Sequence, residues 1–219
     1  MELCGPELGR RAKVGGAIAV ALGLGAAGPG WSWTPTDFFS ACASDCAFSV
    51  FGGNYVDNSL GQVIVTKPQP PMTWDYDTGD HFVGTTFSRR TRLYWGHVTF
   101  EPEIGVGQRF GRQDETEVWA ALFFRYHGFP WDKYLVTTIA ASTGLNWASG
   151  VSDVEKARAR DGAGSQLMHY FAPEVTFALP SAPGSELFFR MHHRSGVFGL
   201  VSDAWGGAQY GSIGIRIWF

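Results

Sequence analysis

The last nine residues of the chain constrain its fold more than any other segment. Apolar and polar or small residues alternate strictly from Gly211 to Phe219, and the apolar positions are Ile213, Ile215, Ile217 and Phe219. A period of two predicts a β-strand with one apolar face. That face is the core in a soluble β-sandwich, but it is the lipid-facing outside in a membrane barrel, whose lumen is polar. The aromatic Phe219, with no polar residue after it, favours the barrel.

The N-terminal segment has the pattern of a secretory signal. Arg10, Arg11 and Lys13 precede an apolar, small-residue run over positions 14–27. This order is typical of a secretory signal peptide, so we expect residues 1–27 to be one, cut near Ala27. An N-terminal anchor is the alternative, but a membrane-spanning helix needs roughly 20 apolar residues. Since no other segment could cross a membrane as a helix, an integral form must be a barrel.

Residues 28–46 are expected to form a periplasmic N-terminal segment. Its Thr34-Pro35-Thr36-Asp37 run predicts a short helix, with a capping Thr followed by Pro. Cys4 is lost when the signal peptide is cleaved, so Cys42 and Cys46 remain. An oxidising compartment makes a disulfide between them plausible. A metal site there is not expected, because no histidine lies beside them. The formal net charge of -3 and the lack of a basic stripe argue against a nucleic-acid partner.

Residues 47–219 read as eight strands, which is the smallest outer-membrane barrel. The strand-like runs are 47–56, 81–90, 95–107, 115–126, 134–147, 167–179, 186–195 and 209–219. Three connections are long, at 56–80, 148–166 and 196–208; the first two are polar and the third is rich in glycine. If both termini lie in the periplasm, these three connections all fall on the outer side, as barrels require. We therefore predict an all-β, eight-stranded antiparallel barrel of the outer membrane.

Strand parity assigns charged residues to the lumen. In the run 115–126, Glu117 and Arg125 alternate with apolar residues, so they point away from the lipid face. The same reasoning places seven charges in one interior, namely Glu101, Glu103, Glu117, Glu174, Arg125, Arg190 and Arg216. Paired charges that fill a narrow lumen explain this set without catalysis.

The seventh strand carries polar groups on the face that should meet lipid. Its apolar column, Leu187, Phe189 and Met191, continues with His193 and Ser195. A polar group facing a bilayer is costly unless it lies at the interface or has a function. Both residues lie at the outer end of the strand, about 6–7 Å apart at Cα. At that spacing the imidazole of His193 can take the proton of Ser195 and make it a nucleophile.

The segment His193-Arg194-Ser195, on the penultimate strand before a glycine-rich loop and the terminal strand, resembles the lipid A 3-O-deacylase (PagL) family. These outer-membrane enzymes cleave an ester-linked acyl chain from lipid A in the outer leaflet. The resemblance implies Ser195 as nucleophile and His193 as general base. Its detailed match covers about the last 30 residues, and elsewhere only the barrel pattern agrees.

Two positions depart from the pattern of that family. The Asn after the nucleophile, which is tied to the oxyanion hole, is Gly196 here, so that only a backbone N–H could donate. The Glu that orients the histidine falls on Gln209, which can orient an imidazole but cannot stabilise its charged form. Asp203, in the loop 196–208, is an alternative if that loop folds over the strand.

The sequence therefore predicts a serine-type deacylase in the cell outer membrane of a Gram-negative bacterium, acting on lipopolysaccharide without a metal or other cofactor. The alternative is a non-catalytic barrel that binds lipopolysaccharide or another envelope protein. The expected partners are lipid A and the lipids of the outer membrane.

Overall fold

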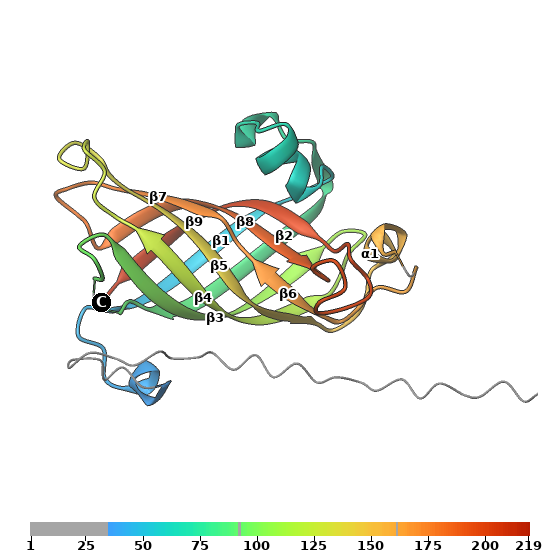
Figure 1. Ribbon diagram of the computed structural model, residues 1–219, viewed down its shortest axis with the longest axis horizontal. Coiled ribbons are helices and arrows are strands. Elements are labelled where there is room, and N and C mark those ends of the chain that lie inside the picture. Colours follow the sequence, from blue (N-terminus) through green and yellow to red (C-terminus); the bar gives the residue numbers. More distant parts are fainter. Residues whose placement is uncertain (1–34, 92, 161) are drawn as a thin grey trace, which may run out of the picture. The chain divides into compact units, whose positions relative to one another are not determined.

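The computed structural model describes residues 35–91, 93–160 and 162–219 (Figure 1). The predicted signal peptide lies outside these ranges. The strands are β1 (Cys46–Val56), β2 (Tyr76–Arg89), β3 (Val98–Phe110), β4 (Thr116–Tyr126), β5 (Val136–Ala148), β6 (Leu167–Phe171), β7 (Glu174–Ala178), β8 (Ser185–Ser195) and β9 (Gln209–Trp218). The short helices are η1 (Pro35–Phe39), η2 (Gln62–Thr66), η3 (Pro71–Thr73) and α1 (Asp153–Arg158).

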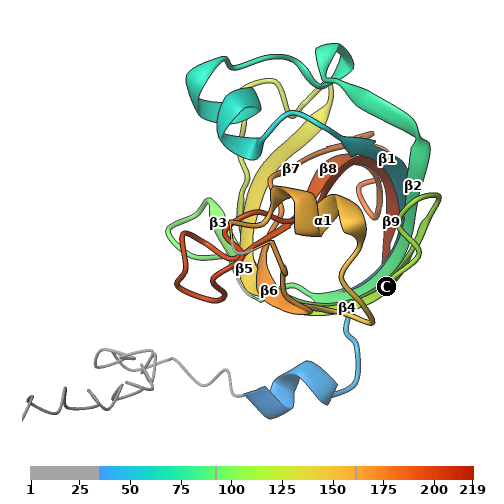
Figure 2. The ribbon, with the colours of Figure 1, turned by 90° about the vertical axis from the view of Figure 1, so that its right-hand side faces the viewer.

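The strands close into a ring, which Figure 2 shows end-on. Each strand pairs antiparallel with its neighbours, and β9 closes the ring on β1. The strands β6 and β7 are two halves of one strand, because both pair with β5 and β8 in an unbroken register. The ladder is interrupted at Ala172 and Pro173, since proline has no N–H to donate. The eight-stranded antiparallel barrel predicted from the sequence is confirmed.

Several strand boundaries differ from the prediction, and the starts of β2 and β3 have clear physical reasons. The strand β2 begins at Tyr76 rather than His81, because Tyr76 and Asp77 still pair with the end of β1 beyond a register shift. The strand β3 begins at Val98 rather than Trp95. Trp95 and Gly96 have φ of 49° and 75° in a tight turn, so they cannot continue a strand.

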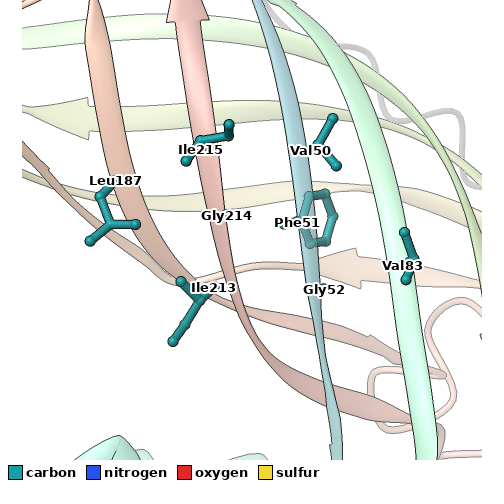
Figure 3. Close-up of a pocket in the computed structure, with 8 residues that line it drawn as sticks. All are labelled: Val50, Phe51, Gly52, Val83, Leu187, Ile213, Gly214 and Ile215. Carbon is teal, nitrogen blue, oxygen red and sulfur yellow. The ribbon is translucent and has the colours of Figure 1, made fainter.

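The barrel has an apolar outside. Ile213, Ile215 and Ile217 of β9 are about half exposed or more, and so are Phe48 of β1 and Leu187 of β8. Figure 3 shows part of this wall around Gly52 and Gly214, a shallow depression that is lined by apolar residues. Parity therefore places the apolar faces outward, as the sequence predicted.

The lumen is filled with charges and aromatic rings. Five arginine side chains are fully buried, namely Arg109, Arg125, Arg190, Arg194 and Arg216. Glu174 contacts three of them, with N–O distances of 2.7 Å to Arg125, 2.6 Å to Arg190 and 2.9 Å to Arg216. All seven charges assigned to the interior are buried. The prediction of a lumen of paired charges is confirmed.

The three long connections leave the barrel at the end that lies opposite the C-terminus (Figure 1). The Arg160 N–H donates to the carbonyl of Ala204 at 2.9 Å, which joins the second and third connections. Glu155 of α1 is buried and lies 3.2 Å from Arg109 and 3.4 Å from Arg194 of the barrel wall. The helix α1 is thereby anchored over this mouth of the barrel.

The segment before β1 is held against the other end. The helix η1 is a 3-10 helix, and its Phe38 packs edge-on against Phe87 of β2 at 5.5 Å. Cys42 and Cys46 form a disulfide. The Arg89 side chain donates to the carbonyls of Ser40 at 2.9 Å and Ala41 at 3.1 Å. None of the helices in the described part of the chain has the length and apolar character needed to cross a membrane.

Replacing Glu174 by alanine should destabilise the barrel strongly. The change leaves Arg125, Arg190 and Arg216 buried without their shared carboxylate, and breaking a buried ion pair costs about 3–5 kcal/mol. Urea unfolding in detergent micelles, followed by heat-modifiable mobility on a gel, measures the loss. As a control, Asp153→Asn removes an exposed ion pair with Lys156 and should leave the unfolding midpoint unchanged. Equal midpoints for Glu174→Ala and the unmodified protein would contradict the role of this cluster.

Candidate functional site

Polar side chains gather on the outer wall of the barrel at the end of β8 near the long connections. His193 and Ser195 are partly exposed and alternate with Arg194, which is buried. His192 points inward, where its Nε2 lies 2.8 Å from Glu117 and its ring stacks on Phe82 at 4.3 Å. The two adjacent histidines therefore face opposite sides of the barrel wall, as parity predicted.

Gln209 of β9 orients the ring of His193. The two residues are direct partners in the β8–β9 ladder, and His193 Nδ1 lies 3.1 Å from Gln209 Oε1. The Gln209 amide nitrogen donates in the other direction, to the carbonyls of Asn58 and, at 3.4 Å, of Val56.

This arrangement sets the protonation of His193. The carbonyls of Asn58 and Val56 accept from the amide nitrogen of Gln209, which fixes the orientation of the amide and leaves its Oε1 facing His193. Because an amide oxygen can only accept a hydrogen bond, His193 Nδ1 must carry the hydrogen. His193 Nε2 is then left with a lone pair, which is the state that a general base requires. The structure thus brings together His193 and Gln209, the pair predicted from the sequence, with the hydrogen of His193 on Nδ1.

Asp203 lies elsewhere. Its side chain is exposed in the connection 196–208, and the contacts found among the described residues do not join it to His193. Of the two residues that the sequence offers to orient the histidine, Gln209 is the one whose side chain reaches it.

His169 lies directly beside Ser195, a neighbour that the sequence did not indicate. His169 of β6 and Ser195 of β8 are opposite each other in the antiparallel ladder, which brings their Cβ atoms to about 4.5–5.5 Å. His169 Nε2 lies 2.8 Å from Thr143 Oγ1 of β5, so this second imidazole is also fixed in place. The parity of β6 could have placed His169 on the outer face, but its pairing with Ser195 depends on strand register.

Ser195 is therefore flanked by two imidazoles. The hydrogen bonds found in the described part of the chain do not include one between Ser195 and His193, which are about 6–7 Å apart at Cα along the same strand face. Hydrogen bonds of catalytic groups are often long without substrate and tighten when it binds. The geometry suits acyl transfer to a hydroxyl whose proton is taken by an adjacent base.

Gly196 starts the connection that follows Ser195. Its carbonyl accepts from the N–H groups of Val201 at 3.1 Å and Ser202 at 3.4 Å, which fixes the turn. A Cβ at this position would lie 2.4 Å from the Ser202 carbonyl oxygen, so only glycine fits. The close approach of the loop backbone thus explains why this position carries no side chain.

Within residues 35–91, 93–160 and 162–219, no group of three or more His, Cys, Asp or Glu side chains is placed to hold a metal ion.

Comparisons with known proteins give a structural match alone. No family model matches the chain. No curated protein matches it either. Among solved structures, the chain is similar to the crystal structure of Neisserial surface protein A (NspA), with a TM-score of 0.47 and 12% sequence identity. The alignment covers 82% of this chain and 100% of the other.

Replacing Gly196 by alanine should loosen the connection 196–208. The added methyl group would overlap the Ser202 carbonyl, so the backbone of the connection must shift. We expect faster cleavage in this connection by a protease added to the folded barrel, and peptide mass spectrometry locates the cut. Gly61→Ala is the matched control, because nothing lies within 4 Å of a Cβ there and its φ is -62°. A cleavage rate equal to that of the control would show that the turn tolerates the methyl group.

Proposed function

We propose that this chain is an outer-membrane barrel with lipid on its outside. Its wall carries half-exposed aliphatic residues, while its buried lumen holds five arginines and their glutamate partners. An apolar outside around a charged inside suits a bilayer and would be unstable in water. The long connections then lie on the outer side, where the outer leaflet of this membrane consists of lipopolysaccharide.

We further propose that the protein is a lipid A deacylase, an ester hydrolase that removes an acyl chain from lipopolysaccharide. The observation that supports this is the outward position of His193 and Ser195, with His193 Nδ1 bonded to Gln209 Oε1. A nucleophile and its base on the outer wall at this level face substrates that lie in the membrane. An ester near the head groups of the outer leaflet is such a substrate.

The reaction proceeds by two acyl transfers. Ser195 Oγ attacks the carbonyl carbon of the ester while His193 Nε2 takes its proton, and the backbone N–H of Gly196 donates to the oxyanion. The bond to the sugar oxygen breaks, and His193 returns the proton to that oxygen. Water then attacks the acyl–Ser195 ester with His193 again as base, which releases the fatty acid and restores the hydroxyl.

Gln209 sets a limit on this mechanism. It holds His193 in the required tautomer, but its neutral amide does not stabilise the imidazolium that forms during each step. In serine proteases the change from Asp to Asn lowers kcat by about 10⁴, largely because the imidazole takes the wrong tautomer. Gln209 keeps the right tautomer, so only the part of that loss that comes from the missing charge applies here. We therefore expect a slow enzyme. The second imidazole, that of His169, is also close to the reacting hydroxyl of Ser195.

Expression in a Gram-negative host should remove one acyl chain from lipid A, and Ser195→Ala should abolish that change. The variant lacks the attacking oxygen but keeps the strand register. Mass spectra of extracted lipid A give the readout, and heat-modifiable mobility verifies insertion of each variant. Ser185→Ala, at the other end of β8, is the matched control and should leave the activity unchanged. Identical spectra with and without Ser195 would favour the alternative, a non-catalytic barrel that binds lipopolysaccharide or an envelope protein.

Replacing Gln209 by glutamate should raise kcat. A carboxylate stabilises the imidazolium of His193, and the triad precedent sets an upper limit of about 10⁴ for the gain. KM should rise as well, because a carboxylate cannot donate to the Asn58 carbonyl. Turnover of purified lipid A in detergent micelles separates the two constants. A fall in kcat for Gln209→Glu would argue against His193 as the base that Gln209 orients.

A further inference from the structure

The connection between β1 and β2 folds back over the outer wall of the barrel. Figure 2 shows this segment, which includes η2, outside the ring of strands. Trp74, near its end, packs edge-on against Phe189 of β8 with ring centroids 5.5 Å apart. Its indole N–H donates to the Gln69 carbonyl at 3.0 Å, which stiffens the segment above the wall.

The low exposure of Met191 shows that the segment covers the wall closely. By parity it points outward like Leu187, yet Met191 is 1% exposed whereas Leu187 is 52% exposed. The difference arises because the β1–β2 connection lies over the first and not over the second.

A groove of about 580 Å³ lies between the segment and the wall. Its floor includes Ile139 of β5, Val175 of β7 and Phe189 of β8. Its roof includes Val63, Pro70 and Trp74 of the connection. The volume is within the range of about 300–1,000 Å³ that is usual for small-molecule sites. The depression around Gly52 and Gly214 is also apolar, but strands alone line it and it has no such roof (Figure 3).

The groove leads to the candidate site. Met191 lines it, and His193 is the next outward residue of β8, about 6–7 Å further along the strand. The roof and the site are also tied together, because Gln209 bonds both His193 and the Asn58 carbonyl at the start of the connection. The apolar groove thus reaches Met191, one outward position before His193 and two before Ser195 on the same strand face.

We propose that this groove holds one acyl chain of lipid A and so places its ester at Ser195. The floor is a part of the wall that meets acyl chains in the membrane, so an acyl chain can enter sideways without crossing water. The roof itself presents Val65 and Met72, which are 73% and 81% exposed, to the same apolar surroundings. That the acyl chain in the groove is a substrate rests on the proposed deacylase activity. That the groove binds the acyl chain can be tested without that activity.

Photo-crosslinking of the inactive Ser195→Ala protein tests the groove. The full-length barrel is inserted into vesicles that contain lipid A with a diazirine in an ester-linked acyl chain, and labelled peptides are mapped by mass spectrometry. We expect labels on the peptides that contain Trp74 and Met191. Val175→Trp, which fills the floor, should lower this labelling about tenfold, equivalent to about 1.4 kcal/mol of binding. Val118→Trp, on the half-exposed outer face of β4, is the matched control and should not lower it.

Three results would overturn the inference: labels spread evenly over the outer wall, no effect of Val175→Trp, or equal labelling by phosphatidylethanolamine with the same diazirine chain. Because the protein used cannot react through Ser195, the assay is independent of catalysis. Labelling in the groove together with unchanged lipid A in the expression host would retain the groove and reject the deacylase. Lipid A deacylation without labelling in the groove would do the reverse.

Discussion

The ion pairs around Glu174 are the interaction on which the rest of this structure depends. One carboxylate from β7 meets guanidinium groups from β4, β8 and β9, so four strands are coupled at one buried point. Charges without water need partners, and these partners can meet only if every strand keeps its register. The period-two pattern makes the strands, and the network inside fixes how they close.

For the proposed chemistry, a lumen filled in this way leaves only the outer wall. Aromatic rings and arginines occupy the interior, and α1 is anchored in the mouth by Glu155. A lipid-sized substrate has no route inward. The polar groups that the network does not use, His193 and Ser195, stand on the wall instead, together with His169 and Thr143. Their placement at the end with the long connections puts them at the level of the head groups in the proposed orientation.

The sequence predicted the parts of this structure that follow from alternation. Seven buried charges and the outward pair on β8 came from parity alone, since each strand has only two faces. Register is a relation between strands, and it was missed where it mattered, at the pairing of His169 with Ser195. The fold-back of the β1–β2 connection was also missed, because a loop without periodicity does not reveal which wall it covers. Parity predicts that Met191 faces lipid, but the β1–β2 connection buries it.

In the proposed deacylase, the neutral Gln209 stands where the family that the C-terminal segment resembles has a carboxylate. A glutamate would stabilise the imidazolium of His193 better, but it has no hydrogen to donate. The amide has two ends, and here one accepts from His193 while the other donates to the Asn58 carbonyl at the root of the groove's roof. Gln209 therefore lacks the negative charge that would stabilise the His193 imidazolium, but it links His193 directly to the β1–β2 connection that covers the wall. In the proposed enzyme, the residue that limits the rate of the chemistry is also the one that holds the substrate groove in place.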